Sequence, residues 1–205
     1  MKQILCFGDS NTYGYMPETG GRYSETERWS GIFKDLCQGK FDVVEAGCNN
    51  RTAFQKNPMG KEYVGYEILP KYLDESFDIV ILFIGINDAQ RVYNRTISEI
   101  KDGVEKLVQL AKELCPRGEI ILVAPSHLGD GVLRHSLFSQ LFDRESIEKS
   151  KFYSRMYYEV SMDNGCKFID LDVVVSASDI DGLHYSKDSH QVIAKTFYKN
   201  IIQGY

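Results

Sequence analysis

The sequence predicts one α/β domain in which helices cover both faces of a five-stranded parallel sheet. Its 205 residues, of which 43% are hydrophobic, are enough for a single core of ordinary size. Short apolar runs alternate along the chain with longer segments that have helical periodicity. Such alternation implies right-handed crossovers and a three-layer α/β/α arrangement. No repeat, low-complexity tract or Pro/Ser-rich linker divides residues 1–205, so we expect a single domain.

The five predicted strands are rich in Val, Ile and Phe, and each is followed by Gly, Pro or Asp. Their hydrophobicity is almost continuous, as expected of strands that are covered on both faces. The segments are Gln3–Phe7, Asp42–Ala46, Asp78–Ile84, Glu119–Ala124 and Lys167–Leu171.

The best-supported helix spans Ile97–Leu114, where apolar residues recur at the spacing of one helix face. Thr96 or Asn94 can cap its start, and Pro116 with Gly118 marks its end. Four other segments also have helical periodicity. They are Trp29–Cys37, Tyr63–Leu73, Ser146–Met162 and Asp188–Ile202.

Composition and charge limit the classes of binding partner and the cellular compartment that we expect for this protein. The net charge of -5 is spread without long runs of either sign, which argues against a nucleic-acid or anionic-membrane partner. No apolar run approaches the roughly 20 residues of a membrane-spanning helix, and the N-terminal run is too short for a signal peptide. The five cysteines lack CxxC spacing, and their odd number argues against a secreted disulfide framework. We therefore expect a soluble, cytoplasmic protein.

Residues of types that could take part in catalysis follow four of the predicted strands. Ser10 follows the first strand, Gly47 the second and Asn87 the third, while Asp181 and His184 come after the last. Ligands of open α/β sheets bind outside the carboxyl ends of the strands. We therefore expect these residues to converge at one edge of the sheet.

These residue types are the ones that acyl transfer requires. A hydroxyl is a weak nucleophile that needs a base, so Ser10 is the predicted nucleophile and His184 its base. Asp181 can fix the tautomer of the imidazole and stabilise its charged form. The backbone amides of Ser10 and Gly47 and the side-chain amide of Asn87 are predicted donors to the oxyanion. This chemistry uses neither a metal nor a cofactor.

Each of these residues also has an ordinary structural interpretation. A Ser after Gly-Asp is more often a turn or cap residue than a nucleophile, and glycines commonly end strands. The joint placement of the residues at one edge is what favours catalysis.

In the order Ser, Gly, Asn, His, the blocks Gly8-Asp9-Ser10, Gly47, Gly85-x-Asn87-Asp88 and Asp181-x-x-His184 resemble the signature blocks of the SGNH (GDSL-type) hydrolases. The pairs Arg28-Trp29 and Glu45-Ala46, the latter before Gly47, resemble more narrowly the arylesterase-like branch. Asn11 stands where the family usually has Leu.

The resemblance implies a flavodoxin-like sheet and a serine esterase or acylhydrolase acting on small carboxylic esters. It implies Ser10 as nucleophile, Asp181 with His184 as the dyad, Ser10, Gly47 and Asn87 as oxyanion donors, and no metal. Related arylesterase-like proteins often form homo-oligomers, although no exposed stripe in this sequence establishes one.

Within the enzyme class, a carbohydrate O-acetyl esterase, a lysophospholipase or a thioesterase would use the same catalytic parts. Pocket shape would distinguish them, and we expect it to depend on Tyr13, Tyr15, the Asn49–Pro58 loop and the irregular segment 126–146. That segment is long enough to form a lid or a pocket wall.

Two other classes remain as alternatives. A flavodoxin-like module that binds phosphate without catalysis is weakly supported, because residues 8–14 match neither common phosphate-binding pattern. A metal hydrolase could use the ligand types Asp181, His184, Asp188 and His190. His127 and His135 are interpreted as exposed loop histidines that could also line the pocket.

Overall fold

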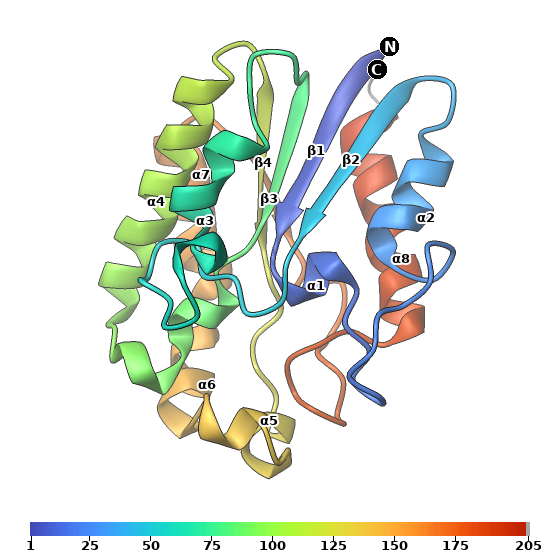
Figure 1. The fold of residues 1–205 in the computed structure, drawn as a ribbon. Coiled ribbons are helices and arrows are strands. Elements are labelled where there is room, and N and C mark those ends of the chain that lie inside the picture. The colour runs from blue at the N-terminus through green and yellow to red at the C-terminus, as the bar shows by residue number, and fades with distance from the viewer. Residues whose placement is uncertain (204–205) are drawn as a thin grey trace.

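The computed structural model describes residues 1–203 and confirms the five-stranded parallel sheet (Figure 1). The strand order is β2-β1-β3-β4-β5, with every pair parallel. This is the order of flavodoxin-like folds. Each strand end lies within one residue of its predicted position: β1 (Lys2–Gly8), β2 (Phe41–Gly47), β3 (Ile79–Phe83), β4 (Glu119–Ala124) and β5 (Lys167–Asp170).

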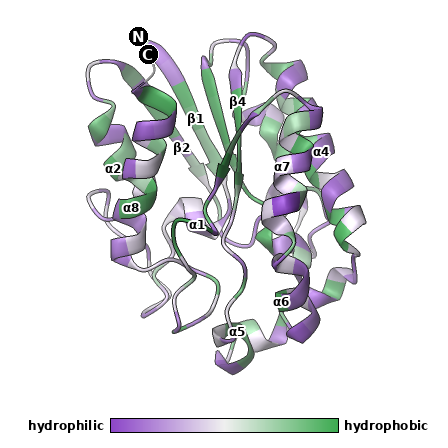
Figure 2. Ribbon diagram, turned by 180° about the vertical axis from the view of Figure 1, so that it is seen from behind, coloured by the Kyte–Doolittle hydropathy of each residue, from purple (hydrophilic) through white to green (hydrophobic). Residues whose placement is uncertain are grey.

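Helices form a layer on each face of the sheet, as predicted. One layer contains α2 (Trp29–Leu36) and α8 (Lys187–Phe197), and the other contains α3 (Gly65–Ile68), α4 (Ile97–Leu114) and α7 (Tyr153–Asp163) (Figure 1). Figure 2 shows the strands mostly in hydrophobic green, with purple at the starts of β1 and β4, and the helices in mixed green and purple, which matches burial of one side of each helix.

The sheet separates two apolar cores because side chains alternate along a strand. In β1, Leu5 and Phe7 belong to the core under α4 and α7, whereas Ile4 and Cys6 belong to the core under α2 and α8. Every one of these four side chains is fully buried. The near-continuous hydrophobicity of the strands therefore has the predicted cause.

The start of α4 is fixed by a capping box. Thr96 Oγ1 accepts the backbone N–H of Glu99, and the Glu99 carboxylate accepts the backbone N–H of Thr96. Asn94, the other predicted cap, instead adopts a left-handed conformation two residues earlier. The prediction of Ile97–Leu114 is confirmed at both ends.

The other four predicted helices differ from the structure. The segment Tyr63–Leu73 forms only the four-residue α3 with short 3₁₀ turns on each side, one of which contains Pro70. The helix Trp29–Cys37 ends one residue earlier, at Leu36. The last helix is regular to Phe197 and continues as a wider turn over Tyr198–Ile202.

The predicted helix Ser146–Met162 is two helices, α6 (Arg144–Ser150) and α7. Each is tied to a different part of the loop after β3. Ser146 Oγ donates to the carbonyl of Ala89, whereas α7 sends Tyr153 and Tyr157 to the carbonyls of Gly85 and Ile84. The break lies at residues 151–152, where no Gly or Pro marks it, and periodicity alone did not show it.

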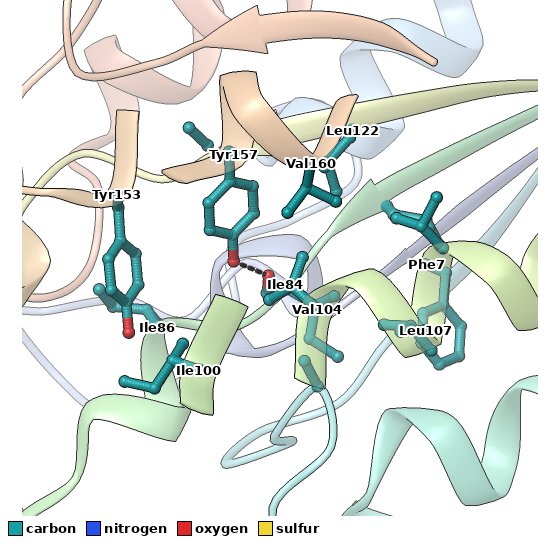
Figure 3. Close-up of a cluster of buried hydrophobic side chains, with 14 of the residues drawn as sticks. Phe7, Ile84, Ile86, Ile100, Val104, Leu107, Leu122, Tyr153, Tyr157 and Val160 are labelled. Atoms are coloured by element: carbon teal, nitrogen blue, oxygen red, sulfur yellow. Dashed lines mark hydrogen bonds between the residues drawn. The ribbon is translucent and has the colours of Figure 1, made fainter. Parts of the chain in front are cut away.

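Tyr157 supports the loop after β3 from within the core (Figure 3). Its hydroxyl donates to Ile84 O at 2.5 Å, and burial raises the pKa of this phenol. We expect Tyr157→Phe to lower the free energy of unfolding by about 1–3 kcal/mol, because the buried carbonyl loses its donor. Urea denaturation measures the change. Tyr158→Phe, at an exposed ring of the same helix, is the control, and an equal loss there would contradict the assignment.

None of the helices within residues 1–203 has both the length and the apolar composition needed to span a membrane.

Candidate active site

The three predicted catalytic side chains form one hydrogen-bonded chain. His184 Nε2 lies 2.8 Å from Ser10 Oγ, and His184 Nδ1 lies 2.6 Å from Asp181 Oδ2. The second oxygen of Asp181 accepts the backbone N–H groups of Leu183 and His184, both at 2.9 Å. Ser10 follows β1, next to β3, where the strand order reverses and α/β sheets place their ligands. The arrangement has the geometry of a nucleophile, a base and an orienting carboxylate.

Ser10 is the first residue of α1 (Ser10–Tyr13), which begins directly after β1. The Asp9 carboxylate accepts the backbone N–H of Asn11 and caps this short helix. Trp29 Nε1 donates to the carbonyl of Asn11, and the Asn11 side-chain amide donates to the carbonyl of Leu183. Asn11 therefore braces the loop that carries His184, at the position where the family usually has Leu.

Aromatic rings hold the imidazole of His184. Tyr15 stacks on it with ring centroids 4.1 Å apart, and Phe138 packs against it at 5.2 Å. His135 in turn stacks on Phe138 at 4.5 Å. Because the ring planes restrict each other, the imidazole stays directed between the carboxylate and the hydroxyl.

The electrostatics of the dyad keep Asp181 ionised and His184 neutral. Burial raises the pKa of Asp181, but hydrogen bonds from the imidazole and the backbone of His184 outweigh it and hold the pKa below its usual value. Burial lowers the pKa of His184, and Asp181 offsets only part of that effect. A neutral imidazole beside a carboxylate is the state that can accept the proton of Ser10.

The lowered pKa of His184 sets the expected pH dependence. Protonation of this residue removes the base, so kcat/KM should fall as the pH drops through its pKa and stay level above it. Since burial moves that pKa below the usual value of 6.5, the half-maximal point should lie below pH 6.5. A pH profile of kcat/KM on a neutral ester measures this point. A midpoint above pH 7 would contradict the assignment.

Asn87 lies in the loop after β3 and faces the same site. Its Nδ2 donates to the carbonyl of Arg51 at 3.0 Å, and its Oδ1 accepts from Gln90 Nε2 at 3.0 Å. The neighbouring Asp88 carboxylate accepts three backbone N–H groups of residues 53–55, which joins this loop to the loop after β2. Asn87 retains one amide hydrogen for a substrate oxygen, because an amide nitrogen carries two.

The geometry argues against Gly47 as an oxyanion donor. Cys48 N–H bonds to Gly8 O across the β1–β2 pair, so the N–H of the preceding residue points to the outer edge of the sheet. A side chain on Gly47 would lie 2.2 Å from the backbone nitrogen of Tyr13, so this glycine serves close packing against α1.

Asn50, three residues further on, lines the pocket beside Ser10 and Asn87. It has a left-handed backbone with φ 59°, and no acceptor within residues 1–203 binds its backbone N–H. The structure therefore offers Asn50 in place of Gly47. The sequence signal was the Asn49-Asn50 pair, because Asn tolerates this conformation better than most residues.

Beside Ser10 and His184 lies a pocket of about 600 Å³. The segment 126–146 forms one wall, in keeping with its predicted role, and the loop after β2 forms another. Tyr15 lines the pocket, whereas Tyr13 packs against Arg22 with the guanidinium 4.5 Å from its ring. The lining residues are Ser10, Tyr15, Asn49, Asn50, Asn57, Pro58, Met59, Asn87, Gln90, Val92, Leu137, Phe138, Gln140, Leu141, Phe142, Leu183 and His184.

The remaining histidines do not assemble a metal site. Within residues 1–203, no three His, Cys, Asp or Glu side chains are grouped so that they could hold a metal ion. His190 is buried, and its Nδ1 accepts the backbone N–H of Trp29 at 3.1 Å. His127 pairs with Asp172 at 2.6 Å on the surface, whereas His135 packs behind the pocket wall.

The chain matches the model of the GDSL-like lipase/acylhydrolase family over residues 6–192. It belongs to this family. Among solved structures, the native aryl esterase of M. smegmatis is 26% identical, with a TM-score of 0.90 and 99% of each chain covered. Est24, a carbohydrate acetylesterase from Sinorhizobium meliloti, is also 26% identical, with a TM-score of 0.91 and 100% of each chain covered.

The lipase/acylhydrolase from Enterococcus faecalis shares the fold at 19% identity, with a TM-score of 0.67 and coverage of 98% of this chain and 95% of that one. No curated protein matches the chain. Membership of the GDSL-like family and the esterase neighbours establish a carboxylic ester hydrolase. The interpretation as a non-catalytic phosphate-binding module is therefore wrong.

The narrower arylesterase-like features have a structural role in this family member. Arg28 makes a bidentate ion pair with Glu45, with nitrogen–oxygen distances of 2.6 and 2.7 Å. Ser30 donates to the same carboxylate at 2.7 Å. These contacts join the start of α2 to the end of β2, next to the loop that carries Asn50.

Proposed function

We propose that this GDSL-family hydrolase is a serine esterase that cleaves small, neutral carboxylic esters through an acyl-enzyme on Ser10. The observation that carries the proposal is the hydrogen-bonded chain Asp181–His184–Ser10 beside a pocket. All three residues are buried, with exposed fractions of 0% for Asp181, 2% for His184 and 4% for Ser10. Within such a site, electrostatic interactions are stronger than in water.

The proposed reaction has two steps. In the first, Ser10 Oγ attacks the ester carbonyl while His184 Nε2 takes its proton, and the same imidazole then protonates the leaving alcohol. In the second, His184 takes a proton from water as the hydroxide attacks the acyl-enzyme. The imidazolium then returns that proton to Ser10 Oγ as the bond to the acyl carbon breaks and the acid leaves. Asp181 stays ionised throughout and stabilises the imidazolium of each step.

Three N–H groups are the proposed donors to the oxyanion: the backbone amides of Ser10 and Asn50 and the side-chain Nδ2 of Asn87. The first two have no acceptor within residues 1–203, and the third has one hydrogen left over. Preorganised donors of this kind stabilise the charge that forms on the carbonyl oxygen. Gly47, the donor expected from sequence, is not part of this proposal.

We expect Asn87→Ala to lower kcat by about 100- to 1000-fold while hydrolysis stays measurable. The loss follows because one donor is removed and the nucleophile and base remain. Steady-state kinetics on p-nitrophenyl acetate measure it. Asn94→Ala, at an exposed asparagine in a turn, is the control. An Asn87→Ala enzyme indistinguishable from the wild type would remove Asn87 from the oxyanion hole.

The pocket supports a neutral substrate. Apart from His184, its lining side chains carry no ionisable group except the phenol of Tyr15. One wall is apolar, with Leu137, Phe138 and Leu141, whereas the loop after β2 contributes the amides of Asn49 and Asn57. A lysophospholipid would bring a phosphate for which this pocket offers no cationic partner, so we rank lysophospholipase activity below cleavage of neutral esters. Thioesterase activity would use the same catalytic parts and stays an alternative from sequence.

A carbohydrate O-acetyl esterase is the second candidate. The amides of Asn49, Asn57 and Gln140 on the pocket wall favour it, because amide groups can both donate to and accept from sugar hydroxyls. Est24, a structural neighbour, is a carbohydrate acetylesterase. The catalytic residues would be the same.

The experiment is hydrolysis of p-nitrophenyl esters from acetate to octanoate, with and without a chelator, beside an acetylated sugar. If the p-nitrophenyl esters are hydrolysed and the chelator does not change the rate, the serine esterase is supported. The dependence of the rate on acyl-chain length then defines the acyl site. Faster release of acetate from the sugar would favour the second candidate. Loss of all turnover in the chelator would overturn the metal-free mechanism.

We also propose a cytoplasmic location, supported by five cysteines that are all free. The small-molecule ester remains the proposed partner. The absence of a nucleic-acid or membrane partner and the formation of a homo-oligomer remain predictions from sequence.

A further inference from the structure

We propose that Gln90 is a positioning residue of the oxyanion hole that holds Asn87 and Asn50 through a single side-chain amide. This inference rests on the proposed function, because it assigns Gln90 a role in the same reaction. Gln90 directly follows the turn Ile86–Ala89 and is only 3% exposed. It also lines the pocket beside the two asparagines.

One nitrogen of Gln90 joins the two loops that carry the proposed donors. Nε2 donates to Asn50 Oδ1 at 2.8 Å, in the loop after β2, and to Asn87 Oδ1 at 3.0 Å, in the loop after β3. An amide nitrogen has two hydrogens, so both are used. No other side chain within residues 1–203 bonds to the side chains of both asparagines.

The orientation of all three amides follows from one backbone carbonyl. The carbonyl of Arg51 can only accept, so Asn87 must direct Nδ2 toward it, and the distance is 3.0 Å. Asn87 Oδ1 then faces Gln90, which must present Nε2, and Asn50 must in turn present Oδ1. In this arrangement Asn87 keeps one N–H hydrogen for the oxyanion.

Gln90 also helps to hold the unusual backbone of Asn50. A left-handed conformation at a residue other than Gly persists only where the surroundings fix it. Here Gln90 fixes the side chain of Asn50, and Asn57 Nδ2 donates to the backbone carbonyl of Asn50 at 2.8 Å. Loss of Gln90 would therefore affect the backbone donor of Asn50 as well as the side-chain donor of Asn87.

The variant Gln90→Glu replaces the donor Nε2 with an acceptor oxygen, with little change in the shape of the side chain. A carboxylate cannot donate to the two amide oxygens that face it, so Asn87 is expected to turn its amide and lose its hold on Arg51 O. We expect kcat to fall by about 10- to 100-fold with KM changed by less than about threefold, since the donors act on the transition state. Gln90→Met removes both donors without adding charge and should lower kcat by about tenfold.

The test measures kcat and KM on p-nitrophenyl acetate for the wild type, both variants and the control Gln38→Glu. Gln38 is exposed and bonds to Asp35 on the surface, away from the pocket. The inhibition constant of an alkyl boronic acid, which forms a tetrahedral adduct with a serine hydroxyl, is measured in parallel. Melting curves monitor folding, and Gln90→Met replaces Gln90→Glu if the latter does not fold.

The expected result is a loss of kcat in both Gln90 variants, a matching rise in the boronic-acid inhibition constant, and wild-type behaviour of Gln38→Glu. A folded variant with wild-type kcat, or one changed in KM alone, would overturn the role of Gln90 and leave the serine esterase standing. A wild type without Ser10-dependent hydrolysis would overturn the proposed function and this inference with it.

Discussion

Ser10→Ala is expected to lower kcat on p-nitrophenyl esters by about 10⁴-fold or more, because no acyl-enzyme can form without the hydroxyl. The fold should persist, since Ser10 Oγ bonds only to His184 among the described side chains. Substrate binding should change little, so the loss belongs in kcat rather than KM. End-point assays with long incubation and a high enzyme concentration measure the residual rate of hydrolysis.

The matched control is Ser98→Ala, at an exposed serine of α4 that lies outside the pocket. It should retain wild-type kinetics. Residual activity of Ser10→Ala within tenfold of the wild type, in a folded protein, would show that another group attacks the ester and would remove the proposed mechanism.

His184→Ala is the second variant expected to lose about 10⁴-fold or more in kcat. Without the imidazole, the hydroxyl keeps its ordinary high pKa, and the leaving alcohol has no proton donor. The cavity left between Tyr15 and Phe138 has room for a small base, so added imidazole should restore part of the rate. Activity is measured as a function of imidazole concentration.

His127→Ala supplies the control for the second variant, because His127 is an exposed histidine that pairs with Asp172 on the surface. If His184→Ala kept its rate, or if His127→Ala lost as much, the base would have to be reassigned. Asp181→Asn should cost less than either catalytic variant, because Asp181 orients the imidazole and does not transfer the proton.

The strands and the hydrogen-bonded chain Asp181–His184–Ser10 could be predicted because their signals are local. Parallel strands covered on both faces require uninterrupted apolar runs, and all five runs became strands. Ser10, Asp181 and His184 stand directly in short blocks of fixed spacing, and the carboxyl edge of the sheet brings those blocks together. In these cases residue type and position along the chain were sufficient.

Other parts of the site depend on contacts that periodicity and spacing do not encode. Gln90 meets Asn50 across forty residues of sequence, and Phe138 reaches His184 from the irregular segment. The outward direction of the Gly47 N–H follows from the register between β1 and β2, which a list of motifs does not contain. The break between α6 and α7 at residues 151–152 likewise has no Gly or Pro to mark it in the sequence.

The most direct test of the central claim is labelling with a fluorophosphonate, which reacts with activated serine hydroxyls, followed by peptide mass spectrometry. The proposed mechanism predicts one adduct per chain, located on Ser10, and loss of ester hydrolysis in proportion to labelling, with no adduct on His184→Ala. Full hydrolysis by the labelled protein, or an adduct on another residue that accompanies the loss of activity, would contradict it.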